Sequence, residues 1–145
     1  MSSIVLIVYQ YNRYLDSRFN LTYTYSVTNQ STGTYGEQLA SQYLSSHGYH
    51  IIERNANSRW GEIDIVAEKN RQVIFVEVKT RSNLRMGKPY EAVSYGKLKR
   101  LFRTIQHYIL IHNWEKRKFQ LDVIGIVLNA DRSVKELRHY ENVGL

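Results

Sequence analysis

The sequence predicts an α/β fold in which a mixed central sheet is flanked by helices. Two amphipathic stretches, residues 35–47 and residues 91–112, repeat their apolar residues with helical spacing. Segments rich in β-branched residues lie between and after them, so the order along the chain is helix, three strands, helix, strand. The length of 145 residues suits one domain with a core of ordinary size.

Composition excludes several classes of protein. The chain is 43% hydrophobic and 23% charged, which is typical of a globular domain. It has no cysteine, so a disulfide framework, a thiol nucleophile and a cysteine-ligated metal are excluded. No apolar run approaches the ~20 residues that span a membrane, and the short run at residues 4–8 lacks the basic start and cleavage site of a signal peptide. We therefore expect a cytoplasmic protein without a membrane segment.

The chain divides into an extension and a domain. Residues 1–32 have poor hydrophobic periodicity and carry only three charged side chains, so we interpret them as an N-terminal extension without chemistry. Poor order and an added edge strand are both compatible with this segment. Residues 33–145 form the expected domain.

The first helix is expected at residues 35–47 and ends before Gly48. Thr34 and Glu37 have the spacing of a capping box, which would make Glu37 a local structural residue. Glu37 also lies at the border of the apolar stripe, within reach of the surface on which the helix packs. The structural role and a role in a site can coexist.

Three strands are expected between the helices. Residues 50–54 form the first strand, and the β-branched runs at residues 63–67 and 73–78 form a hairpin. Asn70 is the residue of the connecting turn that best adopts a positive φ. We interpret Trp60, which precedes the hairpin, as core or hinge packing.

The hairpin turn predicts which side chains are neighbours. A two-residue turn at the tip places Asp64 opposite Glu77 and Glu62 opposite Lys79, all on one face. Opposed Cβ atoms are ~5 Å apart, so two carboxylates there repel each other. A hard divalent cation such as Mg²⁺ between them removes this repulsion. Solvated residues on an exposed hairpin are the alternative, but apolar residues on both faces favour a covered hairpin, where charges need a partner.

The second half of the chain supplies a basic surface. Residues 79–118 carry eleven Lys and Arg residues against two Glu, whereas the rest of the chain has nine basic and eleven acidic residues. A basic lobe beside an acidic site suits an enzyme that acts on a polyanion, and a solubilising surface is the alternative. Within the second helix, Lys97 lies near the buried edge, so contact with the acidic cluster or the scissile phosphate and a plain surface position both stay open. A strand is expected at residues 119–128, and residues 133–140 suit a short edge strand.

Asp64, followed after twelve residues by Glu77-Val78-Lys79, resembles the D…ExK core of the PD-(D/E)xK nuclease superfamily. The longer strings at residues 61–67 and 75–81 resemble the YraN-like family of predicted endonucleases, which is similar to archaeal Holliday-junction resolvases. This resemblance covers residues 33–143 and includes the stretches at residues 33–37 and 87–93. It implies a restriction-endonuclease-like αβββαβ core.

The resemblance also implies roles for individual residues. Asp64, Glu77 and the Val78 carbonyl would bind Mg²⁺ or Mn²⁺, Lys79 would act in catalysis, and Glu37 would add an acidic group. Glu62 would help to bind a second ion or simply pair with Lys79. A further group of residues is expected to contact nucleic acid: Arg81, Arg85, Lys88, Lys97 and Arg100. Asp122 matches a strand-borne aspartate of the family, for which an indirect or structural role is expected.

The function that these features predict is metal-dependent hydrolysis of phosphodiester bonds in DNA, with a 5′-phosphate product implied by the resemblance. Branched DNA and a homodimer follow from the similarity to resolvases, because two symmetric cuts require two active sites. Two alternatives stay open: a nucleic-acid-binding protein that retains the fold without catalysis, and a nuclease that acts on RNA.

Overall fold

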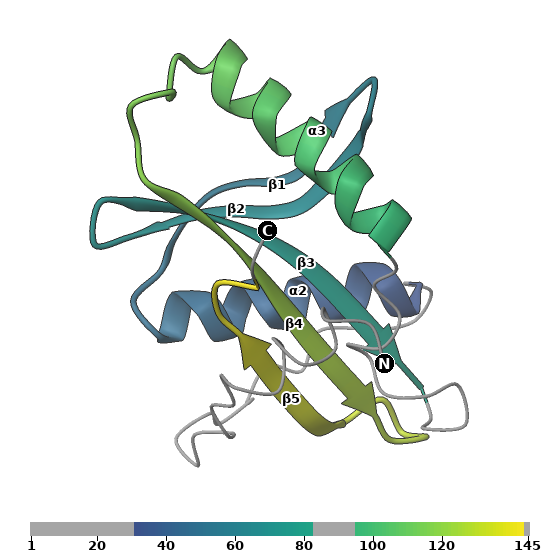
Figure 1. Cartoon of the computed structure of the whole chain (residues 1–145). Helices are drawn as coiled ribbons and strands as arrows, with labels where there is room; N and C mark the ends of the chain where they lie inside the picture. Colours follow the sequence, from purple (N-terminus) through teal and green to yellow (C-terminus); the bar gives the residue numbers. More distant parts are fainter. Residues whose placement is uncertain (1–30, 83–94, 144–145) are drawn as a thin grey trace.

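The computed structural model describes residues 31–82 and 95–143, which form a five-stranded mixed sheet with one helix on each face (Figure 1). This architecture confirms the predicted α/β class and agrees with a restriction-endonuclease-like core. In chain order the elements are α2 (Thr32–Ser46), β1 (His50–Ser58), β2 (Gly61–Lys69), β3 (Gln72–Arg81), α3 (Tyr95–Ile111), β4 (Phe119–Leu128) and β5 (Val134–Tyr140).

The strands follow each other in space in the order β1-β2-β3-β4-β5. Strands β3 and β4 are parallel and are joined through α3, whereas the other neighbouring strands are antiparallel. The β2–β3 turn has positive φ at both Asn70 (52°) and Arg71 (63°), which is the two-residue hairpin turn that the sequence predicts. The pairing from Lys69–Gln72 onward has the predicted register.

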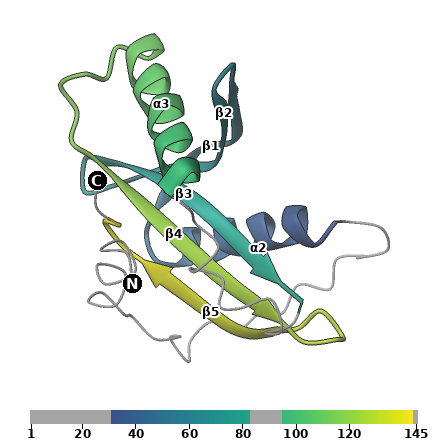
Figure 2. The same cartoon turned by 45° about the vertical axis from the view of Figure 1, so that its right-hand side comes forward.

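The β2–β3 ladder ends earlier than expected. Its last pair is Ile65–Val76, and from there β2 continues with β1 alone as far as the Ser58–Gly61 pair. We call this two-stranded extension, residues 55–64, the arm. It rises beside α3 in both views (Figures 1 and 2). The expected position of Glu62 opposite Lys79 is therefore wrong, because the two strands separate before they reach it.

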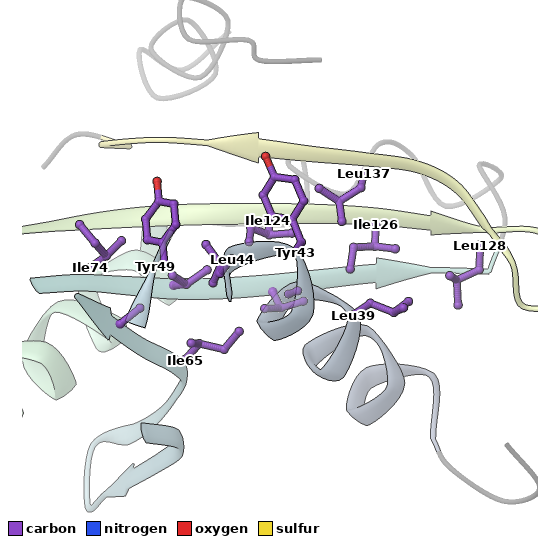
Figure 3. Close-up of a cluster of buried hydrophobic side chains, with 14 residues drawn as sticks. Leu39, Tyr43, Leu44, Tyr49, Ile65, Ile74, Ile124, Ile126, Leu128 and Leu137 are labelled. Carbon is purple, nitrogen blue, oxygen red and sulfur yellow. The ribbon is translucent and has the colours of Figure 1, made fainter. Parts of the chain in front are cut away.

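Two hydrophobic cores hold the helices to the sheet. The core under α2 combines Leu39 and Leu44 with side chains from the central strands and with Leu137 of β5 (Figure 3). The core under α3 combines Ile105 with Phe75 and with side chains of the arm. Burying both faces explains the continuous apolar runs in the middle of these strands, residues 65–67 of β2 and 73–76 of β3.

The cores also reveal a bend in β2. Ile63 belongs to the core under α3, whereas Ile65 belongs to the core under α2, although residues two apart in a regular strand share a face. Asp64 lies between them. The strand therefore changes direction at Asp64, where the arm leaves the sheet.

Helix α2 begins earlier than the sequence suggests. Its N-cap is Ser31, whose side chain accepts a hydrogen bond from the Thr34 backbone N–H at 3.2 Å. The predicted capping box between Thr34 and Glu37 is therefore wrong. In the described part of the chain, neither helix is long and apolar enough to cross a membrane.

Close contact between α2 and β3 depends on Gly36. A Cβ atom at this position would lie 1.7 Å from Thr80 Oγ1 and 2.8 Å from Thr80 Cβ. Only glycine lets the helix backbone approach the strand this closely. The next residue, Glu37, is consequently held close enough to Asp64 for its charge to act on that carboxyl group.

Candidate active site

Five elements bring polar residues together at the point where the arm leaves the sheet. They are Glu37 from α2, Asn55 from β1, Asp64 from β2, Glu77 with Lys79 from β3, and Lys97 from α3. The sequence predicts all of these as site residues except Asn55.

Asp64 is fixed by the neighbouring strand. Its Oδ2 accepts a hydrogen bond of 2.6 Å from the Val78 backbone N–H. A carboxylate that accepts a backbone N–H in this way has a restricted orientation. The side chain of Asp64 is only partly buried, so one side of the carboxylate region stays accessible.

Asn55 connects β1 to α2. It lies across from Asp64 on β1, between the paired positions Arg54–Ile65 and Ala56–Ile63, and has a positive φ of 53°. Asparagine tolerates this conformation better than most residues. Its Nδ2 donates a hydrogen bond of 2.8 Å to Glu37 Oε2. The Glu37 carboxylate therefore faces the site, and its charge contributes to raising the pKa of Asp64.

Glu77 is the most enclosed acidic group of the site, with 3% of its surface exposed. Both Lys79 Nζ and Lys97 Nζ contact the same oxygen, Oε1. Lys79 lies two residues along the same strand, so it shares a face with Glu77. Lys97 reaches the same oxygen from α3. The contact of two ammonium groups with Glu77 Oε1 shows that this buried oxygen binds positive charge.

The electrostatics of the cluster are dominated by burial and crowding. Burial, with the adjacent charge of Glu77, raises the pKa of Asp64 to about 7, although the Val78 N–H and Lys79 oppose this. Burial lowers the pKa of Lys79, but attraction to Glu77 outweighs it, so the pKa lies above its ordinary value. For Lys97 burial prevails, and its pKa lies below its ordinary value.

The donors available for a metal are Asp64, Glu77 and the backbone carbonyl of Val78. In the ranges 31–82 and 95–143, no three His, Cys, Asp or Glu side chains are arranged as a ready metal cluster. The set nevertheless suits a hard cation, because such ions take carboxylate and carbonyl oxygens. Burial first, and then the charge of Glu77, raise the pKa of Asp64, and a cation bound beside Asp64 would favour its ionised form.

The other predicted residues lie at different places. Glu62 is exposed on the arm opposite Asn57, and it does not reach Lys79. Arg81 lies at the end of β3, and Arg100 is exposed on α3. Arg85 and Lys88 lie outside the described residues.

Asp122 is built into the α2 side of the sheet rather than into the site. It is fully buried, and its Oδ2 is 2.8 Å from His139 Nε2. Its Oδ1 accepts from the Asn142 backbone N–H and from Gln120 Nε2, each at 2.8 Å. Of the two roles that the sequence left open, these contacts support the structural one, which fastens β5 and the chain after it to β4.

The sequence predicts core or hinge packing for Trp60, and the core alternative is wrong. Its side chain is 42% exposed at the tip of the arm instead of packing in a core.

The sequence analysis also missed Asn55 as a residue of the site. The signal that points to Asn55 is an asparagine within an otherwise extended segment, at the register position facing Asp64.

A mixed sheet with a carboxylate-and-lysine site at the divergence of two central strands defines the class of the protein as restriction-endonuclease-like α/β. The model of "Uncharacterised protein family UPF0102" matches residues 36–126. The chain belongs to this family, which is the YraN-like family that the sequence resembles.

Similar proteins of the family cover most of the chain. A UPF0102 protein of Caldanaerobacter subterraneus subsp. tengcongensis is 37% identical over 117 residues, which is 80% of this chain and 96% of that protein. A UPF0102 protein of Clostridium botulinum strain 657 is 38% identical over 79% of this chain and 94% of its own length. A third, of Chlorobium phaeobacteroides, is 42% identical over 113 residues, 78% of this chain and 84% of that protein.

Proposed function

We propose that the protein is a metal-dependent endonuclease that hydrolyses phosphodiester bonds in DNA. The observation that carries this proposal is the placement of Asp64, Glu77 and Lys79 around one partly buried position. A stable fold does not need two carboxylates there, because their proximity raises the free energy of the ionised state. A divalent cation bound between the two carboxylates would compensate this cost.

Mg²⁺ or Mn²⁺ would be held by the Asp64 and Glu77 carboxylates and the Val78 carbonyl. When bound, the ion would lower the pKa of a coordinated water and polarise the phosphate. The lysine contacts support this assignment, because Glu77 Oε1 already attracts two ammonium groups. Hard oxygen donors in this number suit Mg²⁺, which usually keeps several waters and takes one or two protein carboxylates.

The side chains of the site have separable tasks. Lys79 keeps its positive charge, since its pKa is raised, and it would stabilise negative charge that develops on the phosphate oxygens. Lys97 Nζ approaches the same region from α3 and would orient the phosphate. Asn55 holds the Glu37 carboxylate beside Asp64 and so restricts its position.

The substrate that we propose is branched or structured DNA, with RNA as the alternative. A diffuse basic surface grips phosphates without reading bases, and such contacts select shape rather than sequence. Cutting a branched substrate symmetrically would require a two-fold dimer. A nucleic-acid-binding protein without catalysis is the other candidate, and metal-independent binding without cleavage would favour it.

The test is cleavage of a labelled four-way junction, a linear duplex, a single strand and an RNA duplex, each with Mg²⁺, Mn²⁺ or EDTA. We expect metal-dependent cutting that Asp64→Asn abolishes. Lys79→Met should lower the rate about 100-fold to 1000-fold, because it removes one stabilising charge. Asp131→Asn removes a carboxylate from an exposed turn and is the matched control, with full activity expected. Absence of cutting on all substrates with either metal would contradict the proposal.

A further inference from the structure

The arm is braced against α3 and therefore has a defined position. Ala56 and Ile63, one from each of its strands, are buried in the core under α3. At the tip, Gly61 lies so close to the helix that an added Cβ would be 3.3 Å from Thr104 Oγ1. Gly61 also has a φ of 146°, which L residues rarely adopt. The tip is thus held beside the middle of α3.

Two arginines from different elements meet at this tip. The guanidinium of Arg59, on the arm, lies 4.8 Å from the centre of the Trp60 ring, and that of Arg103, on α3, lies 5.8 Å from it. Both distances are within the range of cation–π attraction. Trp60 therefore keeps the side chains of Arg59 and Arg103 near each other, although their positive charges repel.

The flank of α3 below the tip is also basic. Lys97, Arg100 and Arg103 recur every third residue and follow one side of the helix. The sequence of α3, Tyr95–Ile111, contains no acidic residue. Cations near a helix N-terminus are unfavourable, because the helix dipole places partial positive charge there. Of the three cations only Lys97 lies in the first turn of α3, and it contacts Glu77, so Arg100 and Arg103 are the cations of this flank that face an outside anion.

These arginines have no competing carboxylate. Within residues 31–82 and 95–143, no ion pair joins an acidic side chain to Arg59, Arg100 or Arg103, and all three are exposed. By contrast, Arg117, which also lies over a tryptophan ring, is paired with Glu68. A cluster of exposed cations repels a second copy of itself, so a polyanion is the occupant that its charge favours.

We propose that four residues form a second contact surface for the nucleic-acid backbone, which we call the tip surface: Arg59, Trp60, Arg100 and Arg103. Trp60 positions Arg59 and Arg103 within it. This inference rests on the proposed function, which places the scissile phosphate at Lys97. Arg103 is six residues after Lys97, so it lies about 9 Å farther along the helix axis. Each strand of a duplex advances about 3.4 Å per nucleotide. Where a duplex runs parallel to α3, the tip surface contacts phosphates two to three nucleotides from the bond that is cut.

The first experiment measures binding in the Asp64→Asn background, so that cleavage does not interfere. Fluorescence anisotropy with a labelled junction is recorded over a series of NaCl concentrations. Changing both Arg59 and Arg103 to Ala should reduce the slope of log Kd against log salt by about 1.8, since each lost phosphate contact removes about 0.9. Arg117→Ala is the matched control and should leave the slope unchanged.

Trp60 is tested separately because its role is positioning. Trp60→Ala keeps both charges, so the salt slope should stay the same while affinity falls about tenfold through loss of two cation–π contacts. Trp60→Phe, which retains a ring, should restore part of the affinity. Unchanged affinity in Trp60→Ala and in the double arginine variant would overturn the proposal. If these variants changed their oligomeric state in sedimentation but bound the junction as before, the tip would be a protein interface, which would also overturn the proposal.

The predicted spacing is tested with neutral phosphates. Single methylphosphonates are placed along a cleavable substrate once the cut is mapped. Those two and three nucleotides from the cut should weaken binding, and Arg103→Ala should remove this sensitivity. Sensitivity only at other positions would refute the placement.

The two proposals fail in distinguishable ways. Binding that depends on the tip surface without any metal-dependent cutting would retain this surface and reject the nuclease. Cutting that proceeds in the double arginine variant with unchanged affinity would retain the nuclease and reject the surface.

Discussion

Neutralising Asp64 should stabilise the metal-free protein at alkaline pH. The pKa of this carboxyl is raised from its ordinary value of 3.8 to about 7, chiefly by burial and then by Glu77. Between these values the unfolded chain has released the proton while the native protein keeps it, so the native state loses stability as pH rises. Below about pH 4 both states are protonated and the difference disappears. Above about pH 7 the full cost of the buried charge is present.

The magnitude follows from the size of the shift. One pKa unit corresponds to about 1.4 kcal/mol, so a rise of about three units corresponds to about 4 kcal/mol as an upper limit. Asp64 is only partly buried, and solvent relaxation reduces this value, so we expect Asp64→Asn to gain about 2 kcal/mol at pH 8.5. At pH 4.5 the gain should be well under half of that, because wild-type Asp64 is then uncharged in the native state. The amide oxygen of asparagine can still accept the Val78 N–H.

The assay is urea unfolding in EDTA at pH 4.5 and pH 8.5. Asp131→Asn is a control of opposite sign, because hydrogen bonds from Ser133 lower the pKa of Asp131 and its ionised form therefore stabilises the native state above pH 4. Adding Mg²⁺ at pH 8.5 should stabilise the wild type more than Asp64→Asn, since a ligand that binds only the native state raises its stability. Equal pH dependence of the wild type and Asp64→Asn would refute the reasoning.

Two further predictions concern positions that shape the site. Gly36→Ala should destabilise the fold by about 1–3 kcal/mol, because the new methyl group overlaps Thr80 and forces α2 away from β3. Gly33→Ala, in the same helix, adds a Cβ whose nearest neighbour is Ser31 Oγ at 4.0 Å, so it should instead stabilise by up to about 1 kcal/mol. Equal urea midpoints for the two variants would contradict this explanation. Arg71→Gly should stabilise the protein by about 0.5–1 kcal/mol, because both turn residues have positive φ and the pair Asn70-Gly suits this turn. Thermal unfolding measures the change, and a lower melting temperature would contradict the prediction.

Some errors in the sequence-based picture share one physical origin. Periodicity locates strands, but it assumes that they stay straight and paired to their ends. The change of face between Ile63 and Ile65 breaks this assumption, because the arm turns toward α3. The expected Glu62–Lys79 pairing and the interpretation of Trp60 as buried both fail for this reason.

The sequence by itself determined the elements and the local geometry of the hairpin. Its β-branched runs and the Asn70 turn are sufficient to predict the β2–β3 register from Lys69–Gln72 to Ile65–Val76, because the turn fixes which residues face each other. The longer strings around Asp64 and Glu77, at residues 61–67 and 75–81, likewise indicated the family to which the chain belongs.

Only the tertiary structure decided which distant residues join that site. Contacts of Lys97 with Glu77 and of Asn55 with Glu37 depend on how closely two helices pack on opposite faces of the sheet. Packing distances of this kind arise from side chains far apart in the chain, such as Gly36 against Thr80, and no local pattern encodes them.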